Sequence, residues 1–216
     1  MNKLKTPILA IESSQELCSA AIFFSENHYA EKNTLQKHVH SEKLPLFINS
    51  LVEDVKIEIK NLSCIAVSSG PGSFTGLRIG FSLAKGIACG ASIPIVPVPS
   101  FYSLALQICT FLPDGIKFLI ANKVSRDELY YQKFISSSGN YRQITDVQII
   151  SNINFPDVIE KDEIIYGNSD FKGSVKISSS SAFFTAKWAY IFGKDLLSLE
   201  YDYLEPYYLK NFNPKV

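Results

Sequence analysis

The sequence has no net charge with which to attract a polyanion. Twenty-one basic residues balance twenty-one acidic ones in a chain of 216 residues. A surface that binds nucleic acid usually carries a strong positive field. We therefore expect the chain by itself to hold nucleic acid poorly.

Long uninterrupted apolar runs are also missing. The longest apolar region, residues 64–106, is broken by Arg78, Lys85 and several prolines, so it does not supply the roughly 20 apolar residues that a membrane-spanning helix needs. Near the start of the chain, Glu12 and Glu16 interrupt the apolar stretch before the core of a signal peptide could form. These absences predict a soluble cytoplasmic protein with no secretion signal and no membrane contact.

Cysteine is scarce and scattered. Cys18, Cys64, Cys89 and Cys109 include no C-x-x-C pair, and no nearby histidine completes a zinc site. We interpret all four as reduced, buried thiols of a cytoplasmic protein.

Histidines cluster once, at His38 and His40 beside Glu42. On an extended segment the two imidazoles share a face, but no third ligand follows at a recognisable metal-binding spacing. Ser41 as a helix N-cap, with His40 packed at the helix start, is the plainer interpretation. The sequence therefore predicts no metal site.

The sequence does contain enough apolar residues for a globular core, with 46% hydrophobic and 12% aromatic residues. Apolar runs in the first half predict three strands followed by alternating helices and strands. We expect strands at residues 7–11, 18–24, 28–36, 64–69 and 93–98, and helices beginning at Ser41 and spanning 75–91 and 99–110.

A turn-rich segment, residues 111–115, precedes a second pattern of the same kind. We expect strands at residues 117–124, 128–136, 141–150 and 163–167, and helices at 156–161 and 181–193. A strand-first order that occurs twice predicts two similar α/β lobes, residues 1–111 and 112–216.

The most informative segment is glycine-rich and spans residues 68–80, between a predicted strand and a predicted helix. It is neither a G-x-G-x-x-G loop, because Thr75 occupies the last glycine position, nor a Walker loop, because no Lys-Ser/Thr pair follows Gly76. A tight strand-to-helix turn is the favoured interpretation. Anion binding by N–H groups and hydroxyls at the helix start stays open as an alternative.

The helix predicted after this turn carries small residues every four positions. They lie at 76, 80, 84 and 88 and again at 86 and 90, while polar residues at 78, 82, 85 and 89 form one line. Small side chains let another backbone approach closely. We predict more apolar surface than one sheet can cover, and therefore packing against another chain. A stripe on residues 44–55 is the candidate second helix, with packing on its own sheet as the alternative.

The turns at which actin-like ATPases bind phosphate lack, in this sequence, the residues that phosphate binding needs. The turn at Glu12, Ser13 and Ser14 has no glycine, and residues 121–126 have no Asp to orient a metal. Gly167 is a lone glycine rather than a nucleoside-binding pair. These features argue against a self-sufficient ATPase.

Three strings resemble the TsaB (YeaZ) family: I-L-A-I-E-S-S at 8–14, H-S-E-K-L at 40–44 and, above all, G-P-G-S-F-T-G-L-R-I-G at 70–80, with weaker similarity at 126–130 and 205–210. The family has Asp where Glu12 stands, and Asp and Arg where Lys123 and Ser125 align, which weakens any nucleotide contact. The resemblance implies an actin-like ATPase (ASKHA) fold, α/β, with two ribonuclease-H-like lobes, each a mixed sheet flanked by helices.

The same resemblance implies a non-catalytic subunit of the complex that forms N6-threonylcarbamoyladenosine at position 37 of tRNA. The implied partners are a catalytic TsaD-like subunit and a TsaE-like ATPase, with tRNA bound only through the complex and a homodimer when the chain is alone. ATP is used by the complex, and the chain has no cofactor of its own. The metal-binding histidines of TsaD align near Ser100 and Leu104, so that metal is not expected.

The partner surface implied by the resemblance uses the two helices discussed above. The expected interface residues are Leu44, Phe47, Ile48, Leu51, Leu77, Arg78, Gly80, Phe81, Ala84 and Lys85. A bulky residue at Gly80 or Ala84 is expected to abolish complex formation and leave the fold largely intact. Glu12, Ser13 and Ser14 form the candidate vestigial phosphate loop, and no catalytic residue is expected.

Three alternatives stay open. The chain could be an ATP-binding ATPase or kinase of the actin-like fold, a metalloprotease, or a plain homodimer without a catalytic partner. The metalloprotease is the weakest, because the sequence lacks a ligand set for the metal.

Overall fold

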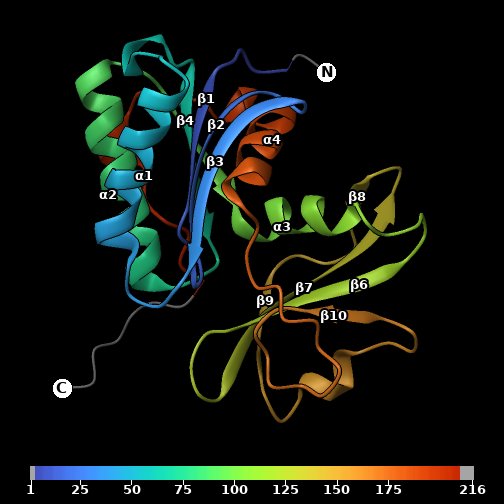
Figure 1. Cartoon of the computed structure of the whole chain (residues 1–216). Coiled ribbons are helices and arrows are strands. Elements are labelled where there is room, and N and C mark those ends of the chain that lie inside the picture. The colour runs from blue at the N-terminus through green and yellow to red at the C-terminus, as the bar shows by residue number, and fades with distance from the viewer. Residues whose placement is uncertain (1–2, 210–216) are drawn as a thin grey trace, which may run out of the picture.

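The computed structural model describes residues 3–209, which form two β-sheets with helices around and between them (Figure 1). The first sheet has the strand order β3-β2-β1-β4-β5. Its strands are β1 (Ile8–Glu12), β2 (Leu17–Ser25), β3 (His28–Leu35), β4 (Cys64–Gly70) and β5 (Ile95–Pro99). The first three are antiparallel neighbours, whereas β4 runs parallel to β1, and β5 parallel to β4.

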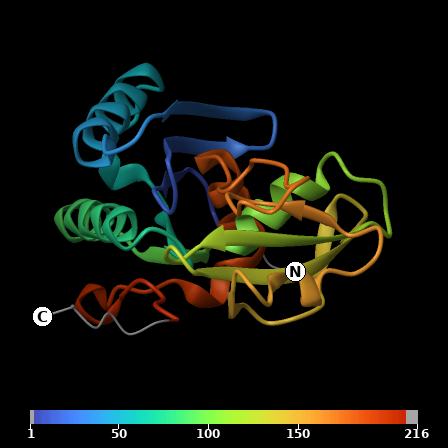
Figure 2. The same cartoon turned by 90° about the horizontal axis from the view of Figure 1, so that it is seen from below.

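Helices cover both faces of the first sheet (Figure 1). On one face, α1 (His40–Asp54) and α2 (Phe74–Ala91) lie side by side, as Figure 2 also shows. On the other face lies α4 (Ala182–Phe192). Because both faces are covered, every residue of β1 and β4 is buried.

The second sheet repeats most of the first sheet's topology. It contains β6 (Lys117–Lys123), β7 (Glu128–Ser137), β8 (Asn140–Gln143), β9 (Gln148–Ser151) and β10 (Ile164–Tyr166). β6, β7 and β8 are antiparallel neighbours, and β10 returns parallel to β6, as β4 does to β1. α3 (Ser100–Cys109) lies between the sheets, where Phe101 and Leu104 pack against Phe118 and Phe134 of the second sheet.

The fold is the predicted actin-like ATPase fold, with two ribonuclease-H-like lobes that each hold a mixed sheet flanked by helices. Local differences occur in the second lobe. The strand predicted at 141–150 is split into β8 and β9, which pair with different parts of β7. Between them the chain turns inward, where the Thr145 hydroxyl accepts from the Lys133 N–H and its carbonyl accepts from Gln132. The helix predicted at 156–161 is a single 3-10 turn, Phe155–Val158.

The C-terminal part of the chain returns to the first sheet. α4 lies in the range predicted for the second lobe but packs on β1 and β2. Beyond it, Ser198 pairs with Ile95 of β5, and the Tyr201 hydroxyl donates to the carbonyl of Ala88 in α2. A boundary between residues 111 and 112 separates the two sheets along the chain, but the lobes are not two consecutive segments.

Among residues 3–209, no helix combines the length and the apolar character that a membrane crossing requires.

Candidate functional site

The turn between β1 and β2 lies directly against the start of α2. The Ser73 N–H donates to the Ser14 carbonyl at 2.7 Å. A Cβ at Gly72 would overlap Ser14, and a Cβ at Gly76 would overlap the carbonyl oxygen of Ser13. Glycine at these positions therefore lets the turn and the helix approach, as expected for a tight strand-to-helix turn.

Glu12, the first residue of the candidate phosphate loop, faces the interior. Its side chain is fully buried and accepts hydrogen bonds from the Ser14 N–H at 2.6 Å and the Thr185 hydroxyl at 3.3 Å. Burial raises the pKa of Glu12, and these hydrogen bonds oppose the rise. Because its oxygens are engaged inside the protein, Glu12 is badly placed to orient a metal-bound phosphate.

The corresponding turn of the second lobe is also closed by internal bonds. The Lys123 N–H donates to Asn168 Oδ1 at 2.7 Å, and the Lys123 ammonium pairs with Asp170 at 2.7 Å. The lone Gly167 stands where a Cβ would overlap the Ala121 carbonyl. Its role is thus close packing between β6 and the segment after β10.

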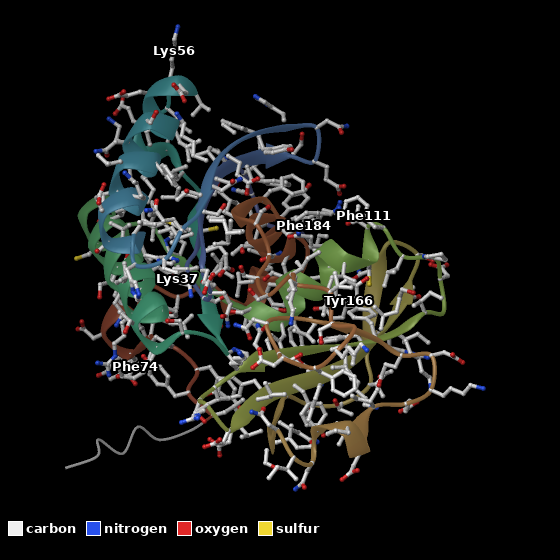
Figure 3. All side chains as sticks on the ribbon, turned by 60° about the horizontal axis from the view of Figure 1, so that its bottom comes forward. Lys37, Lys56, Phe74, Phe111, Tyr166 and Phe184 are labelled. Carbon is white, nitrogen blue, oxygen red and sulfur yellow. The ribbon has the colours of Figure 1, made fainter. Side chains whose placement is uncertain are left out.

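A pocket of about 460 Å³ opens where the two lobes meet, at the starts of α1 and α2. Its lining residues are Gln15, Glu16, Lys37, His38, His40, Ser41, Ser73, Thr75, Gly76, Ile79 and Asn168. Figure 3 shows Lys37 and Phe74 at this end of the helix layer, with Lys56 at the opposite end. Sequence reasoning missed the contributions of Gln15 and Asn168, because residues 153 positions apart carry no local signal of their proximity.

Two side chains of this pocket are buried and have one unpartnered polar atom each. Gln15 is 8% exposed and His40 is 7% exposed, and neither Gln15 Nε2 nor His40 Nε2 has a hydrogen-bond partner among the described residues. Burial lowers the pKa of His40, partly offset by hydrogen bonds to the backbone of Leu17 and Gln15, so the imidazole is neutral near pH 7. The expectation that Ser41 caps α1 is wrong, because the N-cap is Val39 and no side chain caps the helix.

Most of the predicted interface residues lie in the chain's own core, and this prediction needs correction. The buried members are Leu44, Ile48, Leu51, Leu77, Gly80, Phe81 and Ala84. Five of them, Leu44, Ile48, Leu51, Phe81 and Ala84, belong to the hydrophobic core between the first sheet and the two helices. A Cβ at Gly80 would overlap the Ser13 hydroxyl of the same chain, so a bulky residue there disturbs the fold itself.

The exposed side of the two helices bears the remaining predicted residues. Arg78 is exposed, and Phe47 and Lys85 are partly exposed. Between the helices runs the α1–α2 groove, a hollow lined by Ser41, Pro45, Phe74, Thr75, Arg78, Ile79, Ser82 and Leu83. Further along α2, a Cβ at Gly86 or Gly90 would meet nothing within 4 Å, so this stretch of the helix is open to close approach.

The C-terminal segment lies beside this groove. The Arg78 guanidinium stacks on the Phe74 ring at 3.8 Å and donates to the Tyr208 hydroxyl at 3.4 Å. The Tyr207 N–H donates to Ser69 at 2.7 Å. Arg78 is therefore held in place by two aromatic rings. Lys210, the last residue of the resembling tail, lies outside the described residues.

Three of the four cysteines are buried, and burial raises the pKa of Cys64 and of Cys109 to about 12. The fourth, Cys89, is exposed, contrary to the prediction, because it lies on the outward side of α2. Within residues 3–209, no group of three or more His, Cys, Asp or Glu side chains is arranged to hold a metal ion.

Comparison with known proteins places these features in a family. The model of the family described as TsaD, tRNA N6-adenosine threonylcarbamoyltransferase, matches residues 29–143. The tRNA threonylcarbamoyladenosine biosynthesis protein TsaB of Bacillus subtilis is 40% identical over 153 residues, which is 71% of this chain and 64% of that protein. The protein of the same name from Haemophilus influenzae is 26% identical over 152 residues, 67% of this chain and 64% of that protein. The match thus spans less than two thirds of these relatives.

Solved structures agree in fold. YeaZ from Pseudomonas aeruginosa superposes with a TM-score of 0.75 at 20% identity, covering 94% of this chain and 99% of that one. A Pseudomonas aeruginosa protein described as similar to peptidase YEAZ gives a TM-score of 0.78 at the same identity and coverage. The family model matches more than half of the chain, so the chain belongs to the family described as TsaD, tRNA N6-adenosine threonylcarbamoyltransferase, and its similarity to the curated TsaB proteins supports the predicted TsaB (YeaZ) resemblance.

Proposed function

We propose that this chain is a non-catalytic subunit in the synthesis of N6-threonylcarbamoyladenosine at position 37 of tRNA, and that it acts by docking on a catalytic TsaD-like subunit. The names of its relatives support the pathway. The observation that carries the docking role is the contrast between a closed β1–β2 turn and an open outer side of α1 and α2.

We infer that the chain is non-catalytic from the two turns that correspond to the phosphate-binding loops of actin-like ATPases. In the first, Glu12 is fully buried in hydrogen bonds to its own chain. In the second, Lys123 and Asn168 bind each other. The N–H groups of Ser13, Ser14 and Lys123 in these turns already donate within the chain, whereas phosphates require N–H groups that are free to bind them. This makes the alternative of an independent ATPase or kinase the weaker one. On this proposal, ATP is used by the assembled complex and the chain has no cofactor of its own.

The docking surface is proposed to be the α1–α2 groove together with the open stretch at Gly86 and Gly90. This surface combines half-buried apolar side chains, Ile79 and Leu83, with the fixed cation Arg78. Such a mixture of apolar area and one well-held arginine is typical of interface centres. Without the TsaD-like partner, the same side pairs with a second copy as a homodimer.

The other partners follow from the balance of charge. The chain has equal numbers of basic and acidic residues, so tRNA is proposed to bind only after assembly, on a positive surface that the whole complex provides. A TsaE-like ATPase is the proposed third component, reached through the TsaD-like subunit.

A co-purification experiment tests the docking surface. Gly86→Trp places a large ring where a Cβ meets no atom of this chain, so the variant is expected to fold normally and lose the TsaD-like subunit in a tagged pull-down. Lys161→Trp is the control, since Lys161 is exposed in the second lobe and should leave binding unchanged. Retention of the partner by Gly86→Trp, with an unaltered elution volume for the complex, would place the interface elsewhere.

A further inference from the structure

A separate pocket, of about 420 Å³, opens at the start of α3, the helix that lies between the two sheets (Figure 1). It is walled by the ends of β4 and β5, the first turn of α3, Gln132 of β7, residues 146 and 147 before β9, and Tyr207. None of its lining residues lines the pocket at the β1–β2 turn. We propose that the pocket at the start of α3 binds a free amino acid with an apolar side chain. The proposal concerns the chain by itself and does not depend on any partner.

The first argument is a buried amide on an apolar face. Side chains alternate along a strand, and Gln132 lies on the face of β7 from which Tyr130 and Phe134 enter the core beside α3. Gln132 is 2% exposed, and its Nε2 donates to the Thr145 carbonyl at 2.9 Å. Because a carbonyl can only accept, the orientation of the amide is fixed. Gln132 Oε1 accepts from no described residue, so it is left as an acceptor on a side chain that lines the pocket.

The second argument is a carboxylate that no neighbouring cation balances. The Tyr102 hydroxyl donates to Gln143 Oε1 at 2.7 Å, and Gln143 Nε2 donates to Asp146 Oδ1 at 2.6 Å, so the carboxylate is held at the pocket wall. Among the described residues, no lysine or arginine lines the pocket or forms an ion pair with Asp146. The rings of Phe101, Tyr102 and Tyr207 line the same pocket, and aromatic rings attract cations. An ammonium group therefore suits this wall.

The third argument is the start of α3, which favours the opposite charge. α3 is ten residues long, has no acidic residue in its first turn, and is capped by no side chain. The N–H groups of a first turn have no acceptor inside the helix, and the helix dipole places about half a positive charge there. Phe101 and Tyr102 of this turn line the pocket. A carboxylate therefore suits the wall at α3, and a ligand that carries both charges suits both walls.

The size and the remaining lining select among ligands with both charges. An amino acid carries its ammonium and its carboxylate on one carbon atom, so a single small molecule supplies both. Pro71, Pro99 and Val147 add apolar surface to the three rings, which favours an apolar side chain. A volume of about 420 Å³ lies in the range of small-molecule sites. A residue at the end of a peptide has only one of the two charges, so the free amino acid fits better than a chain end.

The test is an NMR titration of the full-length, isotope-labelled chain with L-phenylalanine at constant ionic strength. We expect saturable shifts of the Gln132 side-chain amide and of the backbone N–H groups of Phe101 and Tyr102. N-acetylphenylalanine lacks the ammonium group and phenylalaninamide lacks the carboxylate, so each should bind about tenfold more weakly or worse. Glycine, which has no side chain to place on the rings, should bind more weakly by a similar factor.

A charge-neutral variant tests the wall at Asp146. Asp146→Asn keeps an oxygen that accepts from Gln143 but removes the negative charge. It should weaken L-phenylalanine about tenfold and remove its advantage over N-acetylphenylalanine. Asp162→Asn is the matched control, because Asp162 is exposed and does not line the pocket, and it should leave binding unchanged.

Two results would overturn the proposal. One is the absence of saturable shifts at Gln132 and at the start of α3 in the presence of L-phenylalanine. The other is equal binding of L-phenylalanine and either of its derivatives, since the pocket would then not recognise both charges. If Asp146→Asn fails to fold, the responses of the natural chain to the three phenylalanine compounds decide the matter by themselves.

Discussion

The two halves of α2 carry the same small residues at the same four-residue spacing, yet they lie in opposite surroundings. In the first half, Gly76 and Gly80 are pressed against Ser13 of the β1–β2 turn. In the second half, Gly86 and Gly90 face open space. The first pair serves the chain's own fold, and the second leaves room for something else to approach. A regular spacing of small residues thus does not show whether the helix packs against its own chain or is left open to another molecule.

The largest expected effect on stability comes from a substitution in the first half of α2. Gly76→Ala places a methyl group against the backbone carbonyl of Ser13, where no flexible atom can move aside, and should lower the free energy of unfolding by about 1–3 kcal/mol. Gly86→Ala is the matched control and should raise it by about 0.5–1 kcal/mol, because alanine is the better helix former and meets no clash. Urea denaturation of both variants measures the difference, and equal effects would contradict the contrast between the halves.

A smaller effect on stability is expected at Gly80, where a substitution tests the contact between α2 and Ser13. Gly80→Ala clashes only with the Ser13 hydroxyl, an atom with no hydrogen-bond partner among the described residues. Ser13→Ala removes that oxygen, so the double variant should recover at least about 0.5 kcal/mol of the loss caused by Gly80→Ala. A double-mutant cycle by urea denaturation gives this coupling energy. Strict additivity would mean that the helix and the turn are not in contact there.

The smallest effect concerns pH and the buried carboxyl beside the turn. The pKa of Glu12 is raised by burial, so the carboxyl group holds its proton more tightly in the folded chain than in the unfolded chain. Glu12 therefore lowers the stability of the fold as pH rises above the ordinary pKa of a glutamate. Glu12→Gln removes that dependence. The stability of the variant relative to the natural chain should therefore increase from pH 5 to pH 8 in urea denaturation.

Glu160 of the second lobe supplies a comparison of opposite sign. Hydrogen bonds from Lys117 and Lys133 lower the pKa of Glu160 to about 2, so its contribution to stability is present above its ordinary pKa and is lost as pH falls toward 2. Glu160→Gln should thus cost stability at neutral pH and not at very low pH. If Glu12→Gln and Glu160→Gln changed stability with pH in the same direction, the assignment of Glu12 as a destabilised buried acid would be wrong.

Much of the fold could be predicted from local patterns. The order of strands and helices along the first lobe, the turn at residues 70–76 and the helical stripe on α1 follow from hydrophobic spacing and glycine placement. The split of residues 141–150 into β8 and β9 could not, because it depends on Lys133 and Gln132 of β7 bonding to Thr145. The return of α4 to the first sheet likewise depends on which apolar faces remain uncovered.

The candidate site was less predictable than the fold. Periodicity correctly grouped the residues that share one side of α2, but it does not say whether that side meets the sheet or solvent, and so Gly80 and Ala84 were assigned to an interface while they pack inside. The polar line through Arg78 and Lys85 identified the exposed side of α2 more reliably, since charged groups stay near water.

The sequence by itself determined the family, the order of the elements and the tight turn into α2, because these depend on residues that are neighbours along the chain. Only the tertiary structure decided which glycines are enclosed, that Glu12 is buried, and that Asn168 donates to Gln15 across the two lobes. Those features depend on pairs of groups far apart in sequence, and the free energy of each contact exists only once the folded chain has brought the two groups together.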